Sequence, residues 1–209
     1  MKNLLETFGQ IDIYLFDQLL KGRIQPGMCV LDAGCGSGRN IHYLLQQEFD
    51  VHGIDQSAAA IETVRTLAKQ LGYVDAESRF QLQDVCKMSF ADRSFDIVIS
   101  SAVLHFARDE QHFKAMMDEM WRVLKPSGMF FARLASSIGI EALIENHGDR
   151  RFGLPDGSER FLVDEAMLRA KTQQLGGTFL EPIKTVNVEN KRCMTTWCLR
   201  KNSSIHKDH

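Results

Sequence analysis

A turn that contains three glycines constrains this chain more than any other part of its sequence. The segment Val30–Asn40 starts as an apolar run, passes through Gly34, Gly36 and Gly38, and continues into residues that suit a helix. Glycine has no Cβ and readily adopts positive φ angles, so backbone in such a turn can approach a ligand closely. After a parallel strand, a turn of this kind is typical of α/β sheets that bind nucleotide-like ligands.

Strand and helix patterns alternate around this turn. Ile61, Val64 and Ala68 lie at helical spacing, Ser57 suits the N-cap of their helix, and Gly72 suits its end. The alternation predicts a doubly wound α/β fold, a parallel sheet with helices on both faces. The predicted strands are Met28–Leu31, Val51–Ile54, Phe80–Gln83, Phe95–Ser100 and Met129–Leu134.

The pattern changes after the last of these strands. Residues 136–163 are polar and show no clear periodicity, whereas Asp164–Gln174 predicts a helix. Two further strands, Phe179–Val188 and Cys193–Leu199, are joined by a turn near Glu189. A closing hairpin on a parallel sheet requires at least one antiparallel strand.

Length and composition favour one domain. The chain has 209 residues, of which 44% are hydrophobic and 25% charged, as in an ordinary globular protein. We expect a single domain over residues 1–200, in which residues 1–22 form a helical lid and residues 136–163 an insertion on the substrate side. Residues 201–209 are polar and are expected to form a tail.

Several classes of partner find no support in the composition. The net charge of −2 gives no electrostatic case for nucleic acid, and no apolar run approaches the roughly 18 residues of a membrane span. The five cysteines form no Cys-x-x-Cys pair, which disfavours a metal site or a disulfide framework. Residues 1–10 lack the order of a signal peptide. We therefore expect a cytoplasmic monomer or homodimer without a metal.

The residues around the glycine turn indicate which ligand it holds. A dinucleotide fingerprint would place a third glycine where Arg39 stands, and Asp32 precedes Gly34 by two residues. A carboxylate at that position repels a pyrophosphate but attracts an ammonium group. Asp55 ends the second strand, where an acid can accept hydrogen bonds from ribose hydroxyls, which would serve NAD equally well. Asp84 follows the third strand, so that three carboxylates suit a cationic ligand such as S-adenosylmethionine.

With these motifs the chain resembles class I S-adenosylmethionine-dependent methyltransferases of the small, single-domain type. The resemblance implies a Rossmann-like, seven-stranded sheet of order 3-2-1-4-5-7-6 with strand 7 antiparallel. It also implies S-adenosylmethionine as cofactor and S-adenosylhomocysteine as product. The resemblance rests on Val30–Asn40, Gly53–Ser57, Gln83–Val85, Phe95–Phe106 and Trp121–Met129.

The resemblance also implies roles for single residues. Asp32, Gly34 and Gly36 would line the methionine part of the cofactor. Asp55 and Gln56 would hold its ribose side, and Asp84 and Val85 its adenine. The full set of cofactor-binding residues expected on this basis is Asp32, Gly34, Gly36, Asn40, Asp55, Gln56, Asp84, Val85 and Ser101.

The acceptor side is less constrained. His105 follows the fourth strand, where it can act as a general base or as a structural histidine. Arg133 and His147 are candidates for contact with the substrate. Arg150, Arg151 and Arg160 are interpreted as a solvated face, although arginines can also bind an anionic substrate.

Methyl transfer to a small-molecule acceptor by in-line displacement is the function we expect. Ser100–Val103 stands where many enzymes that methylate nucleic acids and proteins carry an Asn/Asp-Pro-Pro-Tyr/Phe block, which favours a small acceptor. The alternatives are a protein that binds S-adenosylmethionine without transfer, a methyltransferase for macromolecules, and an NAD-binding oxidoreductase.

Overall fold

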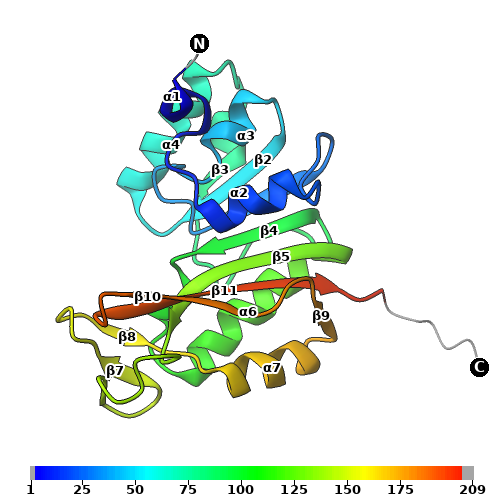
Figure 1. Cartoon of the computed structure of the whole chain (residues 1–209). Helices are drawn as coiled ribbons and strands as arrows, with labels where there is room; N and C mark the ends of the chain where they lie inside the picture. Colours follow the sequence, from blue (N-terminus) through cyan, green and yellow to red (C-terminus); the bar gives the residue numbers. More distant parts are fainter. Residues whose placement is uncertain (1–2, 204–209) are drawn as a thin grey trace, which may run out of the picture.

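The computed structural model describes residues 3–203, in which helices cover both faces of a central sheet (Figure 1). The strands of this sheet are β1 (Cys29–Ala33), β2 (Asp50–Asp55), β3 (Phe80–Leu82), β4 (Phe95–Ser101), β5 (Leu124–Ser136), β9 (Gly177–Phe179), β10 (Lys184–Val188) and β11 (Arg192–Lys201). They follow the order β3-β2-β1-β4-β5-β11-β10, and β9 pairs with β11 as well. Strands β1 to β5 pair in parallel, whereas β11 is antiparallel to its neighbours. The expected order 3-2-1-4-5-7-6 is thereby confirmed, with β11 as strand 7.

One predicted strand is two strands in the structure. The expected strand Phe179–Val188 is interrupted, so that β9 pairs with Leu199–Lys201 and β10 with Arg192–Thr196. Pro182 lies in the interruption and has no N–H to donate to a ladder. Both pieces therefore lie along the same edge of β11.

The helix Ala58–Gln70 begins and ends where its capping residues predict. Ser57 Oγ accepts the Ala60 N–H at 3.3 Å, and Gly72, with φ 93°, follows the end of the same helix.

No helix within residues 3–203 combines the length and the apolar character that a membrane crossing needs. The helices are α1 (Leu4–Phe8), α2 (Ile13–Leu20), α3 (His42–Gln46), α4 (Ala58–Gln70), α5 (Ala76–Arg79), η1 (Leu104–Phe106, a 3-10 turn), α6 (Glu110–Val123) and α7 (Glu165–Gln174).

The two faces of the sheet bury separate apolar cores. Val98 faces the core that holds α6 and α7, whereas its neighbours Ile97 and Ile99 face the core that holds α2, α3 and α4. Such alternation is what strands covered on both faces require. The apolar stripe of α6, which includes Phe113 and Met117, is fully or nearly fully buried in the first core, as its spacing predicts.

The segment 136–163 forms a small sheet that its irregular sequence does not predict. Its strands are β6 (Glu145–Asn146), β7 (Arg151–Gly153) and β8 (Glu159–Phe161), and they pair antiparallel. The Phe161 ring stacks on Phe113 of α6, with ring centroids 5.0 Å apart. The small sheet is thus packed onto the main domain (Figure 1).

Both ends of the domain are tied to the sheet. Asp12, which caps α2 through the Tyr14 N–H, also accepts a hydrogen bond from Arg133 of β5 at 2.5 Å. Lys201 belongs to β11, and its Nζ donates to the Leu124 carbonyl at 2.8 Å. The expected tail 201–209 therefore begins after Lys201, and its residues 204–209 lie outside the described residues.

Candidate functional site

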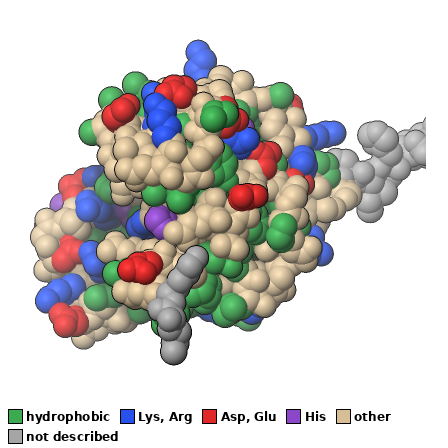
Figure 2. Space-filling model, turned by 90° about the horizontal axis from the view of Figure 1, so that it is seen from above, with side chains coloured by type: hydrophobic (Ala, Val, Ile, Leu, Met, Phe, Trp, Pro, Cys, Tyr) green, Lys and Arg blue, Asp and Glu red, His purple; other side chains and the backbone are tan. Residues whose placement is uncertain are grey.

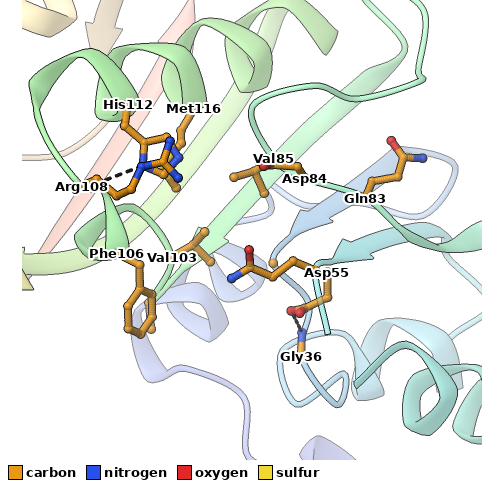
Figure 3. Close-up of a pocket in the computed structure, with 13 residues that line it drawn as sticks. Gly36, Asp55, Gln83, Asp84, Val85, Val103, Phe106, Arg108, His112 and Met116 are labelled. Carbon is orange, nitrogen blue, oxygen red and sulfur yellow. Dashed lines mark hydrogen bonds between the residues drawn. The ribbon is translucent and has the colours of Figure 1, made fainter. Parts of the chain in front are cut away.

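The carboxyl ends of β1, β2 and β4 meet at one edge of the sheet, and a cavity of about 450 Å³ lies there (Figure 3). Among the residues expected to bind the cofactor, Gly34, Gly36, Asp55, Gln56, Asp84 and Val85 border this cavity. Strand order brings them together, because parallel strands end at the same edge. They come from segments up to fifty residues apart in the sequence, as the numbers of Gly34 and Asp84 show.

Asp32 lies directly behind the glycine turn and is fully buried. Neither carboxylate oxygen has a hydrogen-bond partner within the described part of the chain. Burial raises the pKa of Asp32 to about 7; the Arg39 charge opposes that shift and the Asp55 charge adds to it. A buried carboxylate without partners costs free energy, so this position suits a ligand that supplies an ammonium group.

The glycine turn is shaped by close packing and by one carboxylate. Gly34 has φ 92°, and a Cβ on it would lie 2.3 Å from a methyl carbon of Val103. The Gly36 N–H donates to Asp55 Oδ2 at 2.9 Å, as the dashed line in Figure 3 marks, and the Ser57 N–H donates to Oδ1 at 2.8 Å. Two backbone donors thus fix the Asp55 carboxylate at the cavity wall, and each oxygen keeps a lone pair for a ligand hydroxyl.

Asp84, the third acid, also borders the cavity (Figure 3). Asp84 is exposed, and its Oδ1 accepts the Cys86 N–H at 2.8 Å, which closes a short turn after β3. Val85 borders the cavity beside it, so its apolar side chain can cover one face of a flat ring. This arrangement agrees with the adenine position that the resemblance implies for Asp84 and Val85.

Sequence reasoning missed the wall that α6 contributes. Arg108, His112 and Met116 border the cavity, and the Arg108 N–H donates to His112 Nδ1 at 3.1 Å (Figure 3). His112 and Met116 are four residues apart on α6, a spacing that places both on one helix face, whereas Arg108 precedes the helix. Met116 belongs to the buried apolar stripe of α6, whereas Arg108 and His112 have polar side chains and add nothing to an apolar periodicity.

A second cavity of about 290 Å³ adjoins the first, and Ala102 borders both. Ala102 has φ 63°, an uncommon angle for a residue with a Cβ, and its N–H donates to the Arg133 carbonyl at 2.7 Å. Ser101, His105 and Arg133 border this second cavity rather than the first. Ser101 Oγ accepts a hydrogen bond from Arg39 at 3.2 Å.

His105 is buried beside the second cavity. Its Nδ1 accepts the Ala135 N–H at 3.2 Å. Burial, followed by the charges of Arg160 and Arg192, lowers its pKa to about 4. The ring is therefore neutral at pH 7, and with Nδ1 engaged as an acceptor the ring proton lies on Nε2.

Besides the buried Asp32, two expected site residues border neither cavity. Asn40 is buried, borders neither cavity, and accepts the Asp12 N–H on Oδ1 at 3.1 Å, so it holds the N-terminal segment. His147 is exposed on the small sheet and borders neither cavity. Its Nδ1 lies 3.0 Å from Glu159 Oε2, and that hydrogen bond raises its pKa.

The three arginines interpreted as a solvated face behave differently from one another. Arg150 pairs with Asp164 at 2.8 Å, and Arg151 pairs with Glu159 at 2.6 Å. Arg160 instead borders the second cavity, which corrects the interpretation for that residue.

One group of potential metal ligands lies at the opposite edge of the sheet. Cys29, Asp50 and His52 place one ligand atom each within 4.8 Å of one another, at the start of β1 and in β2. Arg79 already donates to Asp50 Oδ1 at 2.5 Å, and burial raises the pKa of Cys29 to about 12, which disfavours a thiolate. The expectation of no metal stays a prediction.

Comparison with known proteins points the same way as the geometry. Residues 30–128 match a family model described as a methyltransferase domain. The bifunctional biotin biosynthesis protein BioHC of Teredinibacter turnerae is 32% identical over 151 residues, 67% of this chain and 25% of that protein. An uncharacterized methyltransferase, YodH of Bacillus subtilis, is 32% identical over 127 residues, 61% of this chain and 48% of that protein. The chain thus spans less than half the length of these two relatives.

A solved structure shares the fold over nearly the whole chain. The 1,6-didemethyltoxoflavin-N1-methyltransferase of Burkholderia thailandensis, crystallised with S-adenosylhomocysteine, has a TM-score of 0.71 at 19% identity. The match covers 97% of this chain and 82% of that one. S-adenosylmethionine, rather than NAD, is the cofactor of this kind of domain. Residues 30–128 thus form a methyltransferase domain, and the sheet order and the glycine turn with its buried acid are those of the class I S-adenosylmethionine-dependent type.

Proposed function

We propose that this protein transfers the methyl group of S-adenosylmethionine to a small-molecule acceptor by in-line displacement. The observation that carries the proposal is the pair of adjoining cavities at Ala102. One cavity is bordered by residues suited to the cofactor, and the other, of about 290 Å³, has room for a small acceptor. In-line attack needs such an arrangement, with cofactor and acceptor on two sides of one point.

Asp55 and Gln56 on the wall of the first cavity would hold the ribose, and Asp84 and Val85 the adenine. Asp32, which is buried behind the glycine turn and does not border the cavity, would hold the ammonium group once the turn admits it. The bound cofactor supplies a methyl group on a sulfonium, which is already a good leaving group. The chain itself therefore contributes binding, alignment and exclusion of water.

Of the two roles open to His105, general base and structural histidine, the first is disfavoured, and the ring suits a hydrogen-bond donor better. Its Nδ1 is engaged by the Ala135 N–H, and its lowered pKa of about 4 makes it a weak base. With the proton on Nε2, the ring can donate to an oxygen of the acceptor. Ser101 lies on the same wall.

The insertion 136–163 and the N-terminal segment 1–22 are both connected to the wall of the second cavity, as expected of parts that form an acceptor pocket. Leu154 and Ser158, from the insertion 136–163, border the second cavity, and Asp12, at the start of α2, binds Arg133 on the same wall. We propose that the insertion and the helical segment 1–22 cover the acceptor within a single domain over residues 1–200. Figure 2 shows basic and acidic side chains interspersed over one face, in keeping with a small acceptor rather than nucleic acid.

Calorimetry with purified protein tests the cofactor half of this proposal. S-adenosylhomocysteine is expected to bind, and NAD under the same conditions is expected not to bind. Transfer of labelled methyl groups to a panel of thiols, amines, phenols and carboxylic acids tests the other half. Tight binding without turnover on any class would instead favour a protein that binds the cofactor without transfer, and turnover only on protein or RNA would favour a macromolecular acceptor.

A further inference from the structure

Four arginines from four separate parts of the chain border the second cavity. Arg39 follows the glycine turn, Arg133 lies on β5, Arg160 on β8 and Arg192 on β11. Asp156 is the single carboxylate on this wall within residues 3–203. The lining of this second cavity is therefore strongly positive, although the whole chain has a net charge of −2.

The chain's own acids leave much of this charge uncompensated. Arg133 Nη1 donates to Asp12 at 2.5 Å, but its Nε is buried and has no partner within the described residues. Arg160 donates to the Glu159 carbonyl at 2.7 Å, lies over the Phe106 ring, and forms no ion pair with a carboxylate of residues 3–203. Arg192 Nη1 lies 3.8 Å from Asp156 Oδ2, a loose pair.

The neutral groups on the same wall also offer donors. His105 carries its proton on Nε2 because Nδ1 accepts a backbone N–H. The Ser101 Oγ accepts from Arg39, which leaves its hydroxyl proton free to donate. Guanidinium, imidazole and hydroxyl donors around one small cavity are complementary to the oxygens of an anion.

We propose that the methyl acceptor carries an oxyanion, a carboxylate or a phosphate ester, and that this group binds among Arg133, Arg160 and His105 in the second cavity. The inference rests on the proposed function, since it takes the second cavity as the acceptor site. Arg39 and Arg192, which are exposed, add to the positive potential at its mouth.

The methylated atom is not an oxygen of that anion. Methylation of a carboxylate would remove the charge that the arginines bind, so they would stabilise the reactant more than the transition state. A nitrogen or sulfur elsewhere in the acceptor avoids this cost. An amine lone pair forms the new N–C bond while the C–S bond breaks and its electron pair stays on sulfur; the methylated ammonium then releases its proton to water.

Binding to the protein saturated with S-adenosylhomocysteine tests the site without requiring turnover. Calorimetry compares benzoate and phenyl phosphate, two anionic probes, with neutral benzamide. At least one anion is expected to bind at least tenfold more tightly than benzamide, and its affinity is expected to fall as salt is added. The stronger of the two anions identifies which oxyanion the site prefers.

Matched variants assign the effect to the cavity. Arg160→Gln is expected to reduce binding of the preferred anion at least tenfold while S-adenosylhomocysteine affinity stays within twofold. Arg169→Gln removes an exposed arginine of α7 that borders neither cavity, pairs with Glu165 and lies over the Phe179 ring. This variant is expected to bind both the anion and S-adenosylhomocysteine as the wild type does.

The outcomes separate this inference from the proposed function. Equal affinities for the anions and benzamide, or an Arg160→Gln variant that binds the anion normally, overturn the anionic acceptor while the cofactor site stands. Failure to bind S-adenosylhomocysteine at all counts against the proposed function instead. A methyl ester as product, recognised because mild base hydrolyses it, would overturn the assignment of the methylated atom.

Discussion

Asp32 is the residue in which stability and ligand binding oppose each other most directly. Burial raises its pKa from 3.8 to about 7. The folded protein therefore holds a proton that the unfolded chain releases between about pH 4 and pH 7, and stability declines as the pH rises through that window. An ammonium ligand binds the ionised carboxylate more tightly, so its affinity rises as the pH rises through the same window.

We expect the affinity for S-adenosylhomocysteine to fall about tenfold between pH 8 and pH 6, because the ionised fraction of Asp32 falls by that factor for a pKa near 7. Calorimetry at pH 8, 7 and 6 measures it. Asp32→Asn is expected to weaken binding at pH 8 and to flatten the pH dependence, while the melting temperature of the free variant rises by roughly 5 °C. A wild-type affinity that is constant over this range would show that Asp32 does not face the ammonium group.

Asp55 acts at the same edge through hydrogen bonds. Asp55→Ala is expected to weaken S-adenosylhomocysteine binding at least about tenfold, through loss of charge-assisted hydrogen bonds to the ligand and of the anchor for the Gly36 N–H. Asp118→Ala, on the exposed surface of α6 and paired only with Lys114, is the matched control. If the two variants bind S-adenosylhomocysteine with equal affinity, Asp55 does not contact the ligand.

Local signals explain why these residues were predictable and others were not. Asp32, Asp55 and Asp84 each end or follow a strand in a short motif, so their position at the sheet edge follows from the strand itself. Arg160 reaches the second cavity from β8 of the small sheet, and Arg192 reaches it from the start of β11 in the main sheet. Nothing in the residues around them distinguishes a cavity arginine from a solvated one, as the ion-paired Arg150 illustrates.

At the scale of elements, the N-terminal segment depends on one buried carboxylate. Asp12 caps α2, accepts from Arg133, and donates its own N–H to Asn40. Removal of the carboxylate leaves the Arg133 guanidinium, only 21% exposed, without its partner. Breaking such a pair from one side is costly because the remaining charge stays desolvated.

Asp12→Ala is therefore expected to lower the free energy of unfolding by about 2 to 4 kcal/mol, as measured by urea denaturation. Asp17→Ala is the control on the same helix. Its carboxylate is half-exposed and pairs with Lys21, so the loss is expected to stay below about 1 kcal/mol. Equal losses in the two variants would mean that Asp12 serves only as a helix cap.

The strands differ in how far the sequence determines them. Parallel strands covered on both faces leave continuous apolar runs, and β1, β2 and β4 were predicted within a few residues for that reason. The strands β6 to β8 have two or three residues each, too few for an alternating pattern to show. Their pairing is decided by packing at Phe161, which is a tertiary contact.

At the scale of the whole molecule, a ligand that binds only the folded state stabilises all of it. At about one hundred times its dissociation constant, S-adenosylhomocysteine is expected to add about 2.7 kcal/mol, which corresponds to a rise of roughly 5 to 10 °C in melting temperature. Differential scanning fluorimetry measures the shift. NAD at the same concentration is the control, and an equal shift with NAD would contradict the assignment of the cofactor.

The strand order of the sheet and its antiparallel strand were predictable from the sequence. The place where the two cavities adjoin was not. They meet at Ala102, which borders both cavities and whose backbone takes a left-handed φ angle. Side-chain volume at this position therefore sets the clearance for two ligands at once. A single substitution at Ala102 can therefore change both the size of acceptor that fits and the affinity for the cofactor.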